Sequence, residues 1–253
     1  MPGNAGAALL QGCTAVFDGV RPRCGGPRSF EGVSMGLSEL LSTYGQNYLD
    51  ALLATWSMTA VCFVFVMVLA VAVTVLRVSP FKPLRWLGDL YVQVFRNIPG
   101  VSLLIIIVYA LPNLNLVLEY RTCVIVTVIL VASAFGSENF MTGINTIGVG
   151  QIEAARSIGL SFGQILRRIV IPQALRTTVL PMTNLLIAVL LSTSLGSQVP
   201  LTPPELTGVV SYINTRSTGG ILAFAIAAAG YALTAVAIGF VGNRIDRKVR
   251  IAR

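Results

Sequence analysis

Charge is scarce in this sequence, and histidine is missing altogether. Only 11% of the 253 residues are charged, while 55% are hydrophobic; soluble domains carry about 25% charged residues. Because so little charge cannot cover a water-soluble fold of this length, an ordinary soluble enzyme is excluded. The lack of histidine removes the commonest general base, metal ligand and pH switch. The composition indicates a protein that crosses a membrane several times.

The four cysteines form no metal-binding pattern. Cys62 and Cys123 lie inside apolar runs and are interpreted as small hydrophobic residues. Cys13 and Cys24 are the pair that a disulfide could join. The sequence therefore predicts neither a metal site nor catalytic residues.

Charge-poor windows predict an all-α polytopic membrane protein with five spans. The predicted spans cover residues 51–76, 88–111, 121–142, 177–196 and 219–242. Each is close to the roughly 20 residues that cross the hydrocarbon core of a bilayer.

Basic residues indicate which connections face the cytoplasm. They are concentrated in loop 77–87, in loop 143–176 and after residue 243, whereas the other connections hold Arg121 and Arg216. By the positive-inside rule the C-terminus is cytoplasmic and, with an odd number of spans, the N-terminus is outside. The net charge of +8 is therefore interpreted as a topological signal and not as a sign of nucleic-acid binding.

Residues 1–34 contain glycine, proline and arginine and show no helical periodicity. No basic segment precedes the apolar residues at the start, which argues against a secretory signal. Two interpretations stay open: a poorly ordered extension of a membrane domain at 35–250, or a stretch that precedes a translation start at Met35. From Leu37 onward, apolar and aromatic residues on one face predict a short interfacial helix before the first span.

Loop 143–176 has the pattern of a helical hairpin outside the bilayer. The segment 151–158 favours a helix, and Gly159 can adopt the left-handed conformation that ends one. Ser161 and Gln164 have the spacing of a capping box, which starts a second helix.

The second helix of this hairpin is predicted to have a buried and an exposed face. Ile165 and Ile169 fall on the buried face, while Arg167 and Arg168 turn toward water or an anionic partner. Pro172 is predicted to disturb the helix where the chain re-enters the membrane.

The loop resembles the EAA loop of ABC-importer permeases. Glu-Ala-Ala at 153–155 is followed after three residues by Gly159, and Ile169 and Pro172 follow at the spacing of that family. In the family this loop supplies coupling helices that insert into a groove of the cytoplasmic ATPase, and small alanines on a short exposed helix suit such a groove. The resemblance implies coupling through Glu153, Ala154, Ala155, Gly159, Ile169 and Pro172.

Other segments extend the resemblance over about residues 45–250. Arg-Asn-Ile-Pro at 96–99 and the stretch 150–161 are similar to segments of the polar amino-acid permeases, and 76–80 and 143–146 look most like glutamate-type subunits. The resemblance implies a subunit of an ATP-driven importer of polar amino acids, most like glutamate, in a bacterial cell membrane. It also implies three kinds of protein partner: a dimeric ABC ATPase, a second permease subunit that is a similar chain or a second copy, and an extracytoplasmic amino-acid-binding protein.

No cofactor is expected on this chain. It has no Gly-x-x-x-x-Gly-Lys-Ser/Thr phosphate loop, so ATP and magnesium are expected on the partner ATPase. The chain departs from the family pattern in two segments. Residues 191–195 lack the family's usual lysine and its acidic or amide residue, and three prolines within 197–206 predict a stiff external loop.

Polar residues at membrane depth are candidates for a translocation path, because they are costly there. Arg96 precedes Pro99 and Gly100, a pair predicted to interrupt the second span. Arg96 either attracts a carboxylate or gates the path, or it extends to the headgroups. Glu138 is expected to pair with a basic residue or to cap a helix. The path candidates are Arg96, Asn97, Pro99, Ser133, Ser137, Asn184, Ser192 and Thr193.

Two other function classes fit the sequence less well. An ion-coupled secondary transporter of small polar solutes would need internal repeats and buried acidic ligands, whereas an odd number of spans cannot be halved and Glu138 is nearly alone. A membrane enzyme would need histidine, metal ligands or paired carboxylates within the spans, which this sequence lacks.

Overall fold

The computed structural model describes residues 36–216 and 220–249, and every regular element in these ranges is helical. The helices are α1 (Leu37–Val78), α2 (Lys82–Asn97), α3 (Gly100–Ala110), α4 (Tyr120–Asn145), α5 (Val149–Ser157), α6 (Phe162–Ile165), α7 (Ile171–Thr177), α8 (Val179–Ser192), α9 (Leu206–Asn214) and α10 (Gly220–Val249). Shorter helical turns lie at Leu111–Leu114, Leu166–Val170 and Thr193–Gln198. The predicted all-α fold is confirmed. The predictions for residues 1–34 and for Cys13 and Cys24 fall outside the described residues.

Four helices are long and apolar enough to cross a membrane: α1, α4, α8 with its extension to Gln198, and α10. The pair α2 and α3 would be a fifth span if it is counted as one broken crossing. The predicted spans 51–76 and 121–142 lie inside α1 and α4, and 177–196 overlaps α8 and its extension.

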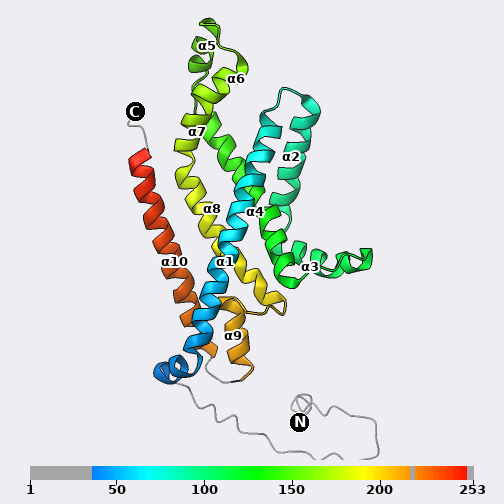
Figure 1. Ribbon diagram of the computed structural model, residues 1–253, viewed down its shortest axis with the longest axis vertical. Helices are drawn as coiled ribbons and strands as arrows, with labels where there is room; N and C mark the ends of the chain where they lie inside the picture. Colours follow the sequence, from blue (N-terminus) through cyan, green and yellow to red (C-terminus); the bar gives the residue numbers. More distant parts are fainter. Residues whose placement is uncertain (1–35, 217–219, 250–253) are drawn as a thin grey trace, which may run out of the picture. The chain divides into compact units, whose positions relative to one another are not determined.

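The second predicted span, 88–111, is not one helix. Helix α2 ends at Asn97, and α3 begins at Gly100 with its axis bent by 99°. The cause is Pro99, which has no N–H to donate and drives the preceding Ile98 into an extended conformation with ψ of 127°. The predicted interruption is confirmed, but it divides the helix and turns the chain sideways (Figure 1).

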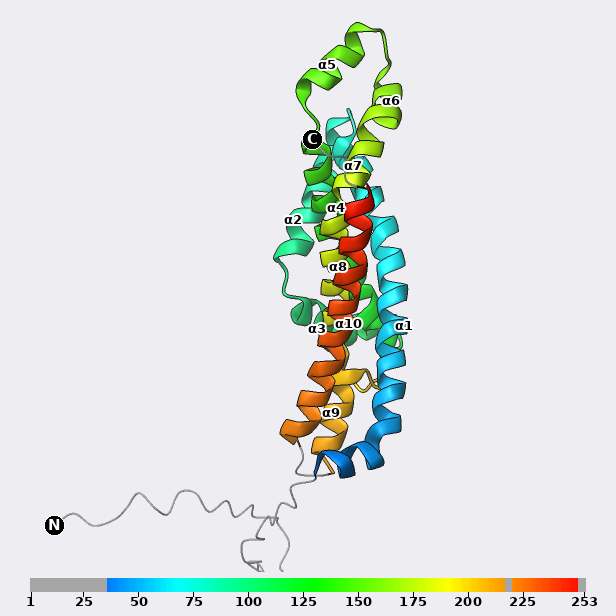
Figure 2. The same cartoon turned by 90° about the vertical axis from the view of Figure 1, so that its left-hand side faces the viewer.

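The predicted interfacial helix and the first span form a single helix, α1, of 42 residues. No break separates the two parts, and α1 contains no proline. Figures 1 and 2 show the first part of α1 turned away from the rest. This part contacts the rest of the protein through one face: Leu40 is fully buried, and the Tyr48 hydroxyl donates a hydrogen bond of 2.9 Å to the Ala223 carbonyl of α10, while most of the other residues of 37–50 are exposed.

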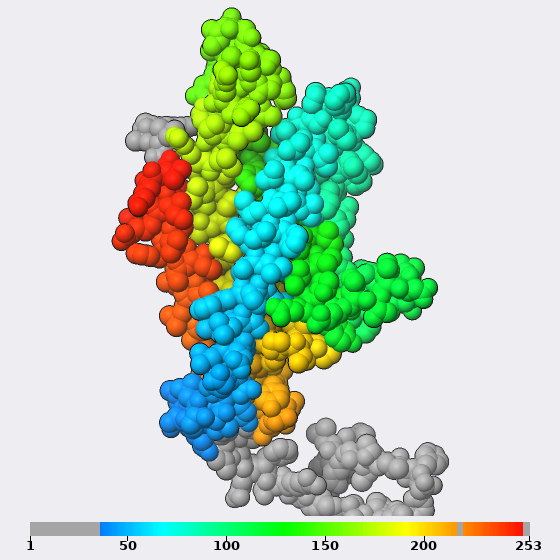
Figure 3. All heavy atoms as spheres, in the orientation of Figure 1, coloured from blue at the N-terminus to red at the C-terminus, as the bar shows by residue number. Residues whose placement is uncertain are grey.

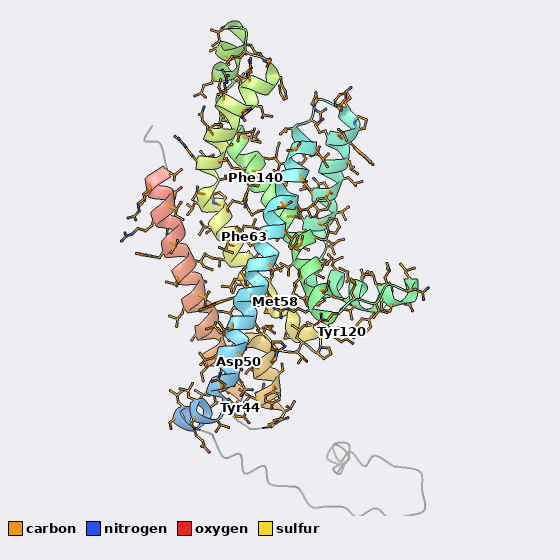
Figure 4. All side chains as sticks on the ribbon, in the orientation of Figure 1. Tyr44, Asp50, Met58, Phe63, Tyr120 and Phe140 are labelled. Carbon is orange, nitrogen blue, oxygen red and sulfur yellow. The ribbon has the colours of Figure 1, made fainter. Side chains whose placement is uncertain are left out.

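The main core lies between α1 and α4 and includes residues of α3 and α8. Met58 of α1 and Phe140 of α4 are both buried in it (Figure 4). Gly136 of α4 allows a close approach of the helices, because a Cβ there would lie 2.8 Å from Ala70 and 3.2 Å from Leu185.

The three basic segments lie at one end of this helical body. Helices α5 and α6, the turn from α1 to α2 and the last turns of α10 are together there in both views, and α9 is at the other end (Figures 1 and 2). In Figure 3, α5 and α6 project from that end. This arrangement fits the sequence pattern, in which basic residues gather on one side of a membrane.

Candidate functional site

The projecting hairpin begins with α5, which ends at Ser157 and is followed by the predicted left-handed residue, Gly159. Gly159 has φ of +83°, which is in the left-handed region. The Gly159 N–H donates to the Arg156 carbonyl at 2.9 Å, and the Leu160 N–H donates to the Ala155 carbonyl at 3.1 Å. This pair of bonds is the Schellman motif, which satisfies the last carbonyls of a helix.

Replacing Gly159 with alanine is expected to destabilise the hairpin by about 1 kcal/mol, because a side chain makes positive φ unfavourable. No atom outside the immediate backbone lies within 4 Å of the added Cβ, so the cost comes from the backbone alone. Faster amide hydrogen exchange across 149–177 would measure it. Gly163→Ala is the matched control: its Cβ also meets open space, inside the helix α6, where alanine is favoured. Equal exchange in the two variants would contradict the prediction.

The second helix of the hairpin starts at the predicted capping box. The Gln164 N–H donates to the Ser161 hydroxyl at 3.4 Å, and the Ser161 N–H donates to the Gln164 side-chain oxygen at 2.9 Å. Arg167 and Arg168 are exposed and Ile165 is buried, as predicted.

Pro172 does not end this second helix. The turn Leu166–Val170 is a π-helix, in which the Ile171 N–H donates to the Leu166 carbonyl. This wider turn precedes Pro172, and the helical path continues through α7 to Thr177. The predicted disturbance is therefore a local widening of the helix.

The hairpin has a small hydrophobic core of its own. Burial in this core makes some of the coupling candidates inaccessible to a partner. Ala155 is 3% exposed and packs against Ile165 and Ala174, because Ile152 and Ala155 share the inner face of α5. The other candidates divide by exposure: Glu153, Ala154, Gly159 and Pro172 are exposed, and Ile169 is partly buried. Ala155 thus supports the hairpin from inside.

A chain of ion pairs joins α1, α2 and α4 below the hairpin. The Arg77 guanidinium lies 2.8 Å from Asp89 and 2.9 Å from Glu138, and Arg96 lies 3.3 Å from the same oxygen of Glu138. The Arg77 side chain is 12% exposed. The prediction that Glu138 pairs with a basic residue is confirmed. The Arg96 guanidinium also lies 5.4 Å from the centroid of the Phe135 ring. The charge of Arg96 therefore contacts groups within the protein.

Two buried path candidates bond neighbouring helices. The Ser133 hydroxyl lies 2.7 Å from the Tyr91 hydroxyl of α2. The Ser137 hydroxyl accepts from the Thr74 hydroxyl at 3.2 Å and from Arg77 at 3.3 Å. Both serines therefore contribute to the contact of α4 with α2 and α1.

The remaining path candidates lie apart from this cluster. Asn97 is exposed at the end of α2 and donates to the Gln93 carbonyl at 2.6 Å, next to the break at Pro99. Ser192 and Thr193 donate to carbonyls of the preceding turn. Asn184 is exposed on α8. No hydrogen bond in the described ranges joins Asn184, Ser192 or Thr193 to the ion pairs.

Glu205 is a buried carboxylate that the sequence reasoning did not single out. It is 0% exposed and caps α9: its side chain accepts the Thr207 and Gly208 N–H groups at 2.6 and 2.8 Å, and the Tyr231 hydroxyl at 2.9 Å. Burial raises the pKa of Glu205 above its ordinary range, and these hydrogen bonds offset part of the rise. The signal for it was an acidic residue that follows two prolines and precedes an apolar helical run.

Comparison with known proteins gives consistent matches. The family model described as "Binding-protein-dependent transport system inner membrane component" matches residues 67–251. The chain is 31% identical over 229 residues to the glutamate transport system permease protein GluC of Corynebacterium efficiens, covering 86% of this chain and 100% of the relative. It is 35% identical over 150 residues to the probable glutamine ABC transporter permease protein GlnM of Bacillus subtilis, covering 59% of this chain and 69% of that protein. Its fold is similar to a chain in the crystal structure of an amino acid ABC transporter with histidines, with a TM-score of 0.75 at 22% identity, covering 82% and 96% of the two chains.

Proposed function

Because the chain belongs to the family of binding-protein-dependent transport system inner membrane components, and is therefore a multi-pass permease and not an enzyme, we propose that it serves an ATP-driven importer of polar amino acids. We propose glutamate as the substrate. The match to a glutamate permease along 100% of its length supports this choice, and the match to a probable glutamine permease supports the wider class.

Coupling to the ATPase is proposed for the hairpin 143–176. The observation that carries this proposal is the exposure of Glu153 and Ala154 on α5, which projects from the helical body (Figure 3). A short helix with a small side chain on its outer face can enter a groove on another protein. Gly159 and Pro172 would shape this surface, while Ala155 and Ile169 would hold it in place from inside.

The end of the protein that carries the basic segments indicates how the permease is oriented in the membrane. We propose that this end faces the cytoplasm and binds an ATPase dimer carrying ATP and magnesium, and that the N-terminus lies outside. An extracytoplasmic binding protein would deliver substrate to the opposite side. A second permease chain would complete the path through the domain 35–250, with the exposed Asn97, Asn184 and partly exposed Ser192 as its polar lining and Arg96 beside it.

Co-purification with the ATPase tests the coupling proposal. The native chain is expected to retain the ATPase, and Glu153→Lys is expected to lose most of it, because the substitution reverses an exposed charge on α5. Glu119→Lys is the matched control, since it makes the same charge change on an exposed residue before α4. Equal loss in both variants, or no loss in Glu153→Lys, would contradict coupling through α5.

Uptake by the reconstituted transporter tests the substrate. Liposomes that contain permease, ATPase and binding protein are expected to accumulate labelled glutamate with internal ATP and without an ion gradient. Stronger accumulation of glutamine or arginine would overturn the choice of glutamate. Uptake that needs an ion gradient and no ATP would instead favour the ion-coupled secondary transporter.

A further inference from the structure

An apolar groove runs between α8 and α10 toward the basic end. Its volume is about 330 Å³, and Thr183 and Leu186 face Ala237, Val241 and Ile245 across it. Helix α10 is the least covered of the long helices, with 11% of its most apolar window buried.

The groove continues into a pocket of about 290 Å³ that is lined by cations. Val241 and Ile245 line both spaces, and the pocket adds Phe240, Arg244 and Lys248. The Arg244 guanidinium lies 5.2 Å from the centroid of the Phe240 ring, which positions it at the rim. Neither Arg244 nor Lys248 forms an ion pair within residues 36–216 and 220–249, so both charges are available to a ligand.

The length of α10 places these cations near the surface of the bilayer. Its 30 residues span about 45 Å, while the hydrocarbon core is about 30 Å thick. The apolar sequence of α10 ends at Val241, so Arg244 and Lys248 follow at the depth of the headgroups. An apolar groove that opens onto two cations at this depth matches a phospholipid, whose acyl chain and phosphate are joined in the same order.

We propose that the groove between α8 and α10 is a binding site for one anionic phospholipid. The acyl chain lies between Leu186 and Ala237, and the headgroup phosphate contacts Arg244 and Lys248. A net negative lipid is preferred over a zwitterionic one, because the two cations have no carboxylate partner among the residues that the structure describes. This inference does not depend on which substrate the transporter carries or on which side the basic end faces.

Native mass spectrometry of the purified full-length chain in neutral detergent tests this site. The chain is titrated with phosphatidylglycerol and with phosphatidylcholine of identical acyl chains. Phosphatidylglycerol is expected to bind about 25-fold more tightly, since each of the two cations near the headgroup contributes roughly a fivefold preference. Arg244→Gln and Lys248→Gln are each expected to reduce the preference by about fivefold.

Two further variants distinguish lipid binding at this site from nonspecific electrostatic attraction of anionic lipids to the basic end. Arg247→Gln removes a neighbouring exposed charge that does not line the pocket, and it is expected to leave the preference unchanged. Ala237→Trp fills the groove without changing charge, and it is expected to weaken binding of both lipids.

Several results would overturn the proposal. They are equal binding of the two lipids by the native chain, equal effects of Arg247→Gln and Arg244→Gln, and unchanged binding in Ala237→Trp. A disulfide between two Ala237→Cys chains in membranes would also overturn it, because a second copy would then occupy the groove.

Discussion

Glutamine in place of Glu138 is expected to destabilise the permease by about 2–4 kcal/mol and to abolish most of its transport. Glu138 accepts charge-assisted contacts from Arg77 at 2.9 Å and from Arg96 at 3.3 Å. The Arg77 side chain is 12% exposed, so the loss of one of its two carboxylate partners leaves a poorly solvated cation paired with Asp89 alone within the described residues. Thermal unfolding in detergent and uptake in liposomes would measure the two effects.

Loss of transport is expected because the ion pairs join α2 to α1 and α4. Asp89 links the middle of α2 to α1, and Arg96 links α2 to α4 two residues before the break at Ile98. Without Glu138, the end of α2 loses its ion pair with α4, and the position of the bent pair α2 and α3 is less firmly fixed.

Glu119→Gln is the control for Glu138→Gln. It makes the same chemical change on the residue before α4, where the side chain is exposed and forms no capping hydrogen bond. A change within about 0.5 kcal/mol is expected there. Equal stability of Glu138→Gln and the native chain would show that these ion pairs contribute nothing to the fold.

The hairpin was predictable because its decisive interactions are local. The N–H groups of Gly159 and Leu160 close the end of α5 through bonds to carbonyls three and five positions before them, and Ser161 caps α6 through Gln164. Such interactions can be predicted from the sequence because the residues that form them lie within a few positions of each other. The burial of Ala155 was not predictable in the same way, because it depends on how α5 folds back onto Ile165 and Ala174.

The break in the second span was predictable in place but not in direction. Pro99 dictates that the helix stops, whereas the 99° bend depends on how α2 and α3 each pack against α4. Likewise, a basic partner was predicted for Glu138, but nothing in the sequence indicates that this partner is Arg77, which lies 61 positions away. Long-range contacts of this kind need the packing of helices to be known first.

Leucine in place of Glu205 is expected to destabilise the protein by about 3–5 kcal/mol, because one buried and two partly buried donors lose their acceptor. These donors are the N–H groups of Thr207 and Gly208 and the hydroxyl of Tyr231. Prolines keep the preceding chain out of a helix, so α9 depends on Glu205 for its start. Thermal unfolding of the solubilised chain would measure the loss.

Tyr231→Phe and Glu205→Gln separate the parts of this effect. Tyr231→Phe removes one donor and leaves the cap intact, so a loss of about 1 kcal/mol is expected. Glu205→Gln keeps one acceptor oxygen and should fall between the other two variants. A loss in Tyr231→Phe as large as in Glu205→Leu would contradict the capping role.

Because burial raises the pKa of Glu205, the native chain should lose stability as the pH rises from the ordinary glutamate pKa through the raised value. Glu205→Gln should lack this component, since it has no proton to release.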